Sequence, residues 1–224
     1  MSEFQHGTLS PWGYIYDAET LPELITLGEF GNYTNLKYGL SDLRIAPNIE
    51  SSSSAIRNYC GWHVAPSLEC GMIYNVRDLR DAFVGGDLLI QLPATFVTGV
   101  SKVIFNAVMN SGTGYYEGDE VTDDRIDSGM GDGLVRIYDV DNLDRKSKVF
   151  IKYTAGFSSS AIPDIKEICA AGVTHALTNT YGVNSEAAGG VSVSYNSVIT
   201  GRGSTTLPSD ARATLDAYKV RGVF

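Results

Sequence analysis

The chain has 224 residues, of which 43% are apolar and 19% are charged, and its formal net charge is −9 at pH 7. This composition can form a folded core and excludes an intrinsically disordered chain. The negative charge argues against a protein whose main task is to grip phosphates, because that affinity comes from clustered lysine and arginine. The length fits one large domain, or one domain that carries an insertion.

Targeting signals and cysteine usage indicate a cytoplasmic protein without a membrane span. No apolar run approaches the roughly 18 residues of a spanning helix, and the first residues lack the pattern of a secretory signal. The three cysteines, Cys60, Cys70 and Cys169, cannot all pair, which is typical of a reducing compartment. We therefore expect a protein that works in the cytoplasm or is assembled there.

The N-terminal part of the chain predicts an extended arm followed by a weak helix. Residues 1–20 are rich in Gly, Ser, Pro and aromatic side chains without a helical period. Such an arm either packs back on its own domain or latches a neighbour. Residues 21–36 have apolar side chains at helical spacing, but Gly28 and Gly31 weaken this predicted helix.

A second helix is predicted within residues 41–60. Pro47 fits best in a first turn, so the firm part is expected from Asn48 to Cys60. The serine run 51–54 lowers helix propensity, but its small side chains suit close approach to another helix.

From about residue 69 to 153 the apolar period changes to two, which predicts strands separated by Gly- and Asp-rich turns. The predicted strands are 87–91, 100–105, 133–139 and 148–153.

A run of acidic residues lies between the second and third of these strands. The segment Gly112–Gly133, called here the acidic segment, has Arg125 as its single cation. Self-repulsion and the glycines predict a long exposed loop. Its acidic residues are Glu117, Asp119, Glu120, Asp123, Asp124, Asp127 and Asp132.

The clearest helix of the sequence follows the last predicted strand. Gly156 breaks the strand pattern, and Pro163 fits a first helical turn, where its missing N–H costs nothing. An apolar stripe at three- and four-residue spacing then continues to Tyr181, and Gly182 supplies the stop. We expect this helix to organise the core.

Short elements are predicted beyond this helix. The alternation over 191–195 predicts a short strand or hairpin arm, and a last helix is expected to begin at 207–210 with a thin apolar face. We expect residues 207–224 to be loosely ordered until they bind a partner. The tail from Lys219 to Phe224 is basic and ends in an aromatic residue.

Together these elements predict an α+β fold. It would be a small antiparallel-type helical bundle with a β-strand insertion, at about 70–153, between the second and third main helices. The predicted organisation is an arm at 1–20 and a single domain at 21–224, whose C-terminal docking segment is about 207–224.

Metal sites are weakly supported. Cys60, His63 and Cys70 lack a second ligand pair at zinc-finger spacing, so isolated core thiols and a surface histidine are the simpler interpretation. An EF-hand loop that starts at Asp123 would need glycine and glutamate where Ser128 and Leu134 stand. An irregular calcium site in the acidic segment stays an alternative.

No cofactor or catalytic set is predicted either. The glycines at 112, 114 and 118 have the wrong spacing for a dinucleotide-binding turn, and there is no Walker loop or nucleophile elbow. The three histidines have no serine or cysteine nucleophile in a recognisable setting, so we do not expect an enzyme.

Four motifs resemble one known family. They are A-I-R-N-Y-C-G at 55–61, Y-T-A-G-F at 153–157 with I-P-D-I-K at 162–166, the S-E…G…S-V-S-Y pattern within 185–195, and L-P…L-D-A-Y within 207–218. In this order they resemble the head–tail connector proteins of tailed bacteriophages, the adaptor or head-completion family.

The resemblance implies a structural virion protein, assembled in the host bacterial cytoplasm, at the neck between head and tail. It implies a ring, usually of twelve copies, below the portal protein, with genomic DNA passing through its channel without sequence recognition. The β part would face a downstream neck or tail-completion protein. The portal-docking candidates are Leu215, Tyr218, Lys219, Arg221 and Phe224. The candidates for a ring surface or channel lining are Glu117, Asp119, Glu120, Asp123, Asp124 and Asp127.

The alternative from another class is a β-rich carbohydrate- or calcium-binding module of a virion or surface protein. In that case the helices would serve as its scaffold.

Overall fold

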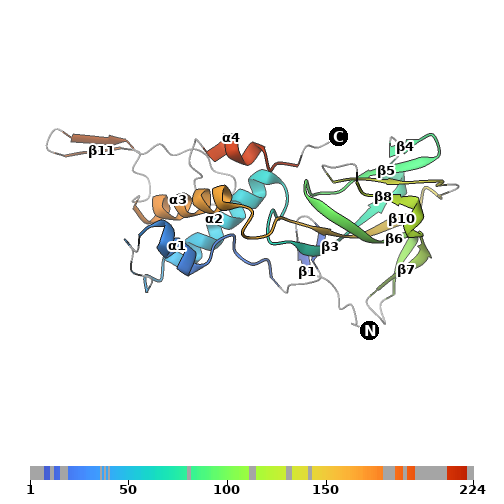
Figure 1. Ribbon diagram of the computed structural model, residues 1–224, viewed down its shortest axis with the longest axis horizontal. Coiled ribbons are helices and arrows are strands. Elements are labelled where there is room, and N and C mark those ends of the chain that lie inside the picture. The colour runs from blue at the N-terminus through green and yellow to red at the C-terminus, as the bar shows by residue number, and fades with distance from the viewer. Residues whose placement is uncertain are drawn as a thin grey trace. The chain divides into compact units, whose positions relative to one another are not determined.

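The structure is a computed structural model that describes residues 8–10, 13–15, 20–35, 37, 39, 41–79, 82–110, 115–129, 133–140, 143–178, 185–188, 191–194 and 211–220. The chain forms two compact units (Figure 1). The β unit is built around Gly61–Phe157, and the helical unit is built from Pro22–Cys60 and Ser158–Lys219. The helical unit is thus assembled from two stretches of chain that lie on either side of the β unit in the sequence.

Two antiparallel sheets make up the β unit. The first has the strand order β1-β2-β3-β10-β6-β7, and its strands are Thr8–Ser10, Gly13–Ile15, Leu68–Asn75, Lys148–Ala155, Val97–Asn110 and Tyr115–Glu120. The second has the order β4-β5-β9-β8, and its strands are Phe83–Val84, Asp87–Gln91, Leu134–Ile137 and Ile126–Asp127. The 3-10 helices η1 (Val76–Asp78) and η3 (Asp123–Arg125) lie between strands. The phenol of Tyr74 on β3 donates to the carbonyl of Gln91 on β5 at 2.9 Å, which ties the two sheets together.

Strand β10 is the central strand of the first sheet, paired with β3 on one side and β6 on the other. Val149, Ile151 and Tyr153 are buried on one of its faces, and Phe150 and Lys152 are buried on the other. Residues of both faces are therefore covered, and the lysine requires a partner.

The described residues of the helical unit form four helices and a separate two-stranded ladder. The helices are α1 (Leu27–Tyr33), α2 (Ile45–Cys60), α3 (Pro163–Thr178) and α4 (Ala211–Asp216), and the ladder pairs β11 (Ser185–Ala188) with β12 (Val191–Ser194). Helix α1 begins with a capping box in which the hydroxyl of Thr26 accepts from the Glu29 N–H and the Glu29 carboxylate accepts from the Thr26 N–H. The core of this unit contains Leu24, Ile25, Phe30, Ile45, Ile49, Ile56, Ile165, Val173 and Leu215.

Small residues let α2 and α3 approach closely, as the serine run predicts. Ser52 and Ser53 are fully buried, and Ser53 Oγ lies 3.7 Å from the sulfur of Cys169. A Cβ added to Gly172 would lie only 3.0 Å from Ser52 Oγ. The contact between these helices therefore depends on residues that leave room for a neighbouring backbone.

The segment Y-T-A-G-F contains a glycine with no space for a side chain. Gly156 has a φ of +111°, and an added Cβ would lie 2.3 Å from the carbonyl oxygen of Pro66 and 2.7 Å from His63 Nε2. Its N–H donates to the Phe96 carbonyl at 3.0 Å, and the ring of Phe96 stacks on Phe157 at a centroid distance of 4.4 Å. The glycine thus joins two loops to the end of β10.

The predicted fold class is wrong. The structure is mostly β-sheet, in two antiparallel sheets with few helices, rather than a helical bundle with a β insertion. Helices α1 and α4 have only seven and six residues, whereas β6 alone has 14. Helix contacts are local in sequence and leave a regular apolar period, whereas strand partners here lie far apart along the chain and leave no local sign of their pairing.

The predicted bounds hold for some elements and fail for others. Strand β5 and the start of α3 at Pro163 are as expected, and Pro47 lies in the first turn of α2, although that helix begins three residues before Asn48. The predicted end of α3 at Tyr181 lies outside the described residues. Residues 211–216 are already helical in the isolated chain, against the expectation of loose order before binding.

Candidate interaction surfaces

The acidic segment is not the long loop that its composition predicts. It contains the edge strand β7, the 3-10 helix η3 and the short strand β8. Each contributes acidic side chains: Glu117, Asp119 and Glu120 come from β7, Asp123 and Asp124 from η3, and Asp127 from β8. All are exposed except Asp127, which is half-buried. Asp132 lies outside the described residues.

Arg125, the cation of the acidic segment, forms hydrogen bonds to backbone carbonyls. Its guanidinium donates to the carbonyl of Tyr138 at 2.8 and 3.1 Å and to the carbonyl of Asp139. Asp127 accepts from the N–H of Gly129 at 2.9 Å and from the phenol of Tyr138 at 3.4 Å. The arginine therefore fixes the turn to the neighbouring strand and leaves the exposed carboxylates to other donors.

Metal ligands do not gather in the described part of the chain, where no group of three or more His, Cys, Asp or Glu side chains is placed to hold an ion. The three thiols are buried, as predicted, and burial raises the pKa of Cys60 and of Cys169 to about 12. The predicted surface histidine is wrong for His63, which is buried with Nε2 3.0 Å from the Ala155 carbonyl.

Helix α4 is fastened to α2 and α3 through the portal-docking candidates. Leu215 is fully buried, and the phenol of Tyr218 donates to both carboxylate oxygens of Asp164 at 2.8 and 2.9 Å. Partial burial, with this hydrogen bond, raises the pKa of Tyr218 to about 12. Lys219 Nζ lies 5.2 Å from the ring centroid of Tyr59. Arg221 and Phe224 lie outside the described residues.

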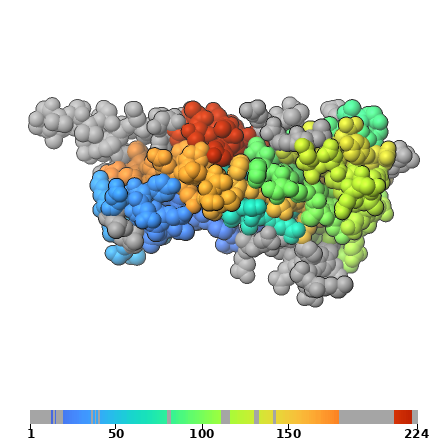
Figure 2. Space-filling view, viewed as in Figure 1, coloured from blue at the N-terminus to red at the C-terminus, as the bar shows by residue number. Residues whose placement is uncertain are grey.

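Tyr59 makes a second attachment of the same kind. Its phenol donates to Asp216 of α4 at 2.8 Å, and this hydrogen bond raises the pKa of Tyr59. Two tyrosine–carboxylate pairs thus hold a six-residue helix that lies at the surface (Figure 2). Arg212 and Ala213 are exposed on its outer side. The sequence predicted the apolar face of α4 but not these polar attachments.

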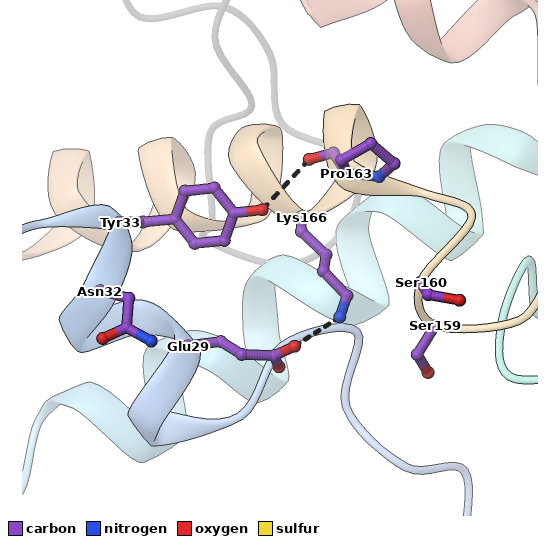
Figure 3. A pocket seen from close by; sticks show the side chains of 7 residues that line it. All are labelled: Glu29, Asn32, Tyr33, Ser159, Ser160, Pro163 and Lys166. Carbon is purple, nitrogen blue, oxygen red and sulfur yellow. Dashed lines mark hydrogen bonds and ion pairs between the residues drawn. The ribbon is translucent and has the colours of Figure 1, made fainter.

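A hollow of about 330 Å³ lies between α1 and the start of α3 (Figure 3). At its centre, the Lys166 ammonium pairs with the carboxylate of Glu29, and the phenol of Tyr33 points to the Pro163 carbonyl at 3.4 Å. The hydrogen bond from Lys166 lowers the pKa of Glu29. Sequence reasoning missed this feature, although Lys166 is the last residue of the I-P-D-I-K motif. The lining residues are Glu29, Asn32, Tyr33, Ser159, Ser160, Pro163 and Lys166.

The described surfaces thus combine exposed carboxylates on the β unit with a short C-terminal helix that is attached to α2 and α3. Residues 23–220 match the model of a family described as head completion protein, so the chain belongs to the head completion protein family. It is a structural component of the phage head and virion, in a family of structural proteins rather than enzymes. A comparison with individually curated proteins gave no match. The helices of the described residues include none long and apolar enough to cross a membrane.

Proposed function

We propose that this head completion protein forms a ring of twelve copies below the portal, joins the head to the tail and continues the DNA channel. The observation that carries the proposal is the family match over residues 23–220, which spans both units and all four helices. A closed ring needs two different side patches on each copy that complement one another. The exposed carboxylates of β7 and η3 and the exposed side of α4 are available for such contacts.

The proposed portal-docking segment is α4 with the residues that follow it. Tyr218, Lys219, Arg221 and Phe224 are the proposed contacts, and Leu215 acts from inside by anchoring the helix in the core. Support comes from the two tyrosine–carboxylate attachments, which position the segment before binding and so reduce the ordering cost of association.

The proposed role of the acidic segment is to lie at a ring surface, where it lines the channel or faces a downstream neck or tail-completion protein. Its exposed carboxylates are too costly to bury without partners, and an acidic wall repels DNA and leaves no binding minimum in which the duplex would stall. The protein would act at the virion neck after assembly in the host cytoplasm, without contact to a membrane.

Negative-stain images of the purified chain with and without its portal protein test the ring. We expect rings, or a collar on the portal, and a chain that stays monomeric and unbound under both conditions would contradict the proposal.

Portal docking is tested with Lys219→Ala/Arg221→Ala. This variant should weaken portal binding at least about tenfold, because charge-assisted contacts contribute about 1.5 to 3 kcal/mol each. The matched control is Arg145→Ala/Lys146→Ala, which removes two exposed charges from the β unit. Equal binding by both variants would contradict docking through the tail.

A further inference from the structure

Strand β7 is an edge strand of the six-stranded sheet. Within the described residues it pairs only with β6, through a register that runs from Ile104 opposite Glu120 to Asn110 opposite Tyr115 (Figure 1). The outward N–H and C=O groups of an edge strand can pair with a strand of another chain. The side chains of the edge strand decide which partner strands bind.

Two carboxylates of β7 are held in place by neutral donors. Asn110 Nδ2 donates to Glu117 Oε1 at 2.7 Å, and Asn106 Nδ2 donates to Asp119 Oδ2 at 2.7 Å. Glu117 and Asp119 are both exposed, and because they are two residues apart on a strand they lie on the same face. The asparagines orient this pair of charges without neutralising them.

Other carboxylates of the β unit have cationic partners. These ion pairs join Lys102 with Glu120 at 2.9 Å, Lys152 with Glu69 at 2.7 Å, Arg136 with Asp87 at 2.5 Å, and Arg77 with Asp78 at 3.3 Å. Among the ion pairs of the described residues, none includes Glu117 or Asp119. These two charges therefore remain available for cations of a partner.

A β-bulge builds this geometry into the backbone of the hairpin. Asn106 and Ala107 of β6 both stand opposite Gly118 of β7. Asn106 has a φ of +54°, a conformation that asparagine tolerates better than most residues. A Cβ added to Gly118 would lie 2.3 Å from the carbonyl oxygen of Phe105, so only glycine fits between the two acidic residues.

We propose that β7 is a docking edge for an extended segment of a different protein that carries Lys or Arg at two alternate positions. Strand addition would bring those cations opposite Glu117 and Asp119, at the short cross-strand separations where opposite charges attract. Pairing of two β7 edges is disfavoured because it brings like charges together. The inference rests on the part of the proposed function in which the acidic segment meets another protein, and it does not depend on portal docking.

The test measures binding of a capped Thr-Val-Lys-Val-Arg-Val-Thr peptide to the full chain by calorimetry. Glu117→Gln/Asp119→Asn keeps the shape and the acceptors for the asparagines but removes both charges. It should weaken binding by about five- to tenfold, because two cross-strand ion pairs are lost. The matched control, Asp78→Asn/Asp144→Asn, removes two exposed charges of the β unit away from β7 and should change binding by less than about twofold.

Hydrogen exchange distinguishes strand pairing from general charge attraction, because nonspecific electrostatic binding would not protect the backbone amides of β7. Peptide binding should slow the exchange of alternate amides over 116–120 in the parent chain, because a paired strand occupies outward N–H groups. Unchanged exchange with bound peptide, or equal weakening by the two double variants, would overturn the proposal. Thermal unfolding of both variants checks that they fold.

Two further arms identify the occupant and separate this inference from the proposed function. A peptide of residues 219–224 that binds β7 as tightly as the probe would assign the edge to a second copy and overturn a heterologous partner. If the chain forms rings but does not bind the peptide, the docking-edge proposal is wrong and the proposed function is unaffected. Peptide binding by a chain that forms neither rings nor portal collars would support the edge and contradict the ring.

Discussion

Gly156 shows how a single residue fixes the end of the central strand. We expect Gly156→Ala to lower the free energy of unfolding by about 3 kcal/mol or more, because its φ of +111° costs a side chain about 1 to 3 kcal/mol and the new Cβ would meet the Pro66 carbonyl. Urea unfolding measures the loss. The control is Gly99→Ala in β6, where no atom lies within 4 Å of an added Cβ. Similar losses for the two variants would contradict this role.

The Glu29–Lys166 pair makes stability depend on pH at a single carboxylate. Its lowered pKa means that Glu29 contributes stability fully above its unfolded pKa, about 4.5, and that this contribution is lost as the pH falls through the folded pKa. Glu29→Gln should therefore lower the urea midpoint at pH 6 to 7, and this difference from the parent should shrink steadily as the pH is lowered below about 4.5. The exposed Glu50→Gln on α2 should follow the parent profile. A Glu29→Gln profile parallel to the parent would contradict the assignment.

At the scale of elements, the α2–α3 contact predicts a coupled pair of substitutions. An alanine in a helix interior normally gains about 1 kcal/mol over glycine, but in Gly172→Ala the added Cβ must displace Ser52 Oγ, which lies 3.0 Å away. Ser52→Ala removes that hydroxyl, which has no hydrogen-bond partner among the residues that the structure describes. The free energy of unfolding of the double variant should be about 0.5 to 1 kcal/mol higher than the sum of the two single changes predicts.

The control repeats this cycle with a substitution at Ser54, which is exposed on the same helix, in place of the substitution at Ser52. Ser54→Ala combined with Gly172→Ala should be additive in urea unfolding. A coupling of equal size in both cycles would show that the effect is not the contact between the helices.

Sequence reasoning located the elements with strong periodicity and missed those stabilised by distant partners. The strands at 87–91 and 148–153 and the start of α3 were predicted because their apolar periods are long and regular. Strand β3 was not predicted, although its eight residues pair with β10 along its whole length. The acidic strand β7 looks like a loop because its stability comes from β6 and from Tyr116, which stacks on Phe150 at 4.7 Å.

The candidate surfaces were predicted by residue type and not by geometry. Acidic side chains are visible in the sequence, so the exposure of Glu117, Asp119, Glu120, Asp123 and Asp124 could be anticipated. The roles of Asn106 and Asn110 could not, because they depend on a bulge that no local pattern specifies. The attachment of Tyr218 to Asp164 likewise joins residues 54 positions apart.

At the scale of the whole molecule, the net charge of −9 is concentrated in part on the acidic segment. In the proposed ring, Asp123→Asn/Asp124→Asn/Asp127→Asn should leave the fold intact, because the first two side chains are exposed and asparagine keeps an acceptor at the third. It should slow DNA passage in reconstituted necks, because a weaker repulsion lets the duplex linger at the wall. Salt at about 1 M, where the Debye length is about 3 Å, should reduce the difference from the parent.

The control removes three other exposed carboxylates through Glu50→Gln/Asp78→Asn/Asp144→Asn. It gives the same net charge, so a change of DNA passage that both triple variants share would reflect total charge alone. Loss of monomer folding in the Asp123, Asp124 and Asp127 variant would instead show that these carboxylates are structural. An effect confined to that variant, and reduced by salt, would assign the acidic segment to the channel, because the field of a charged wall acts on DNA only within about a Debye length.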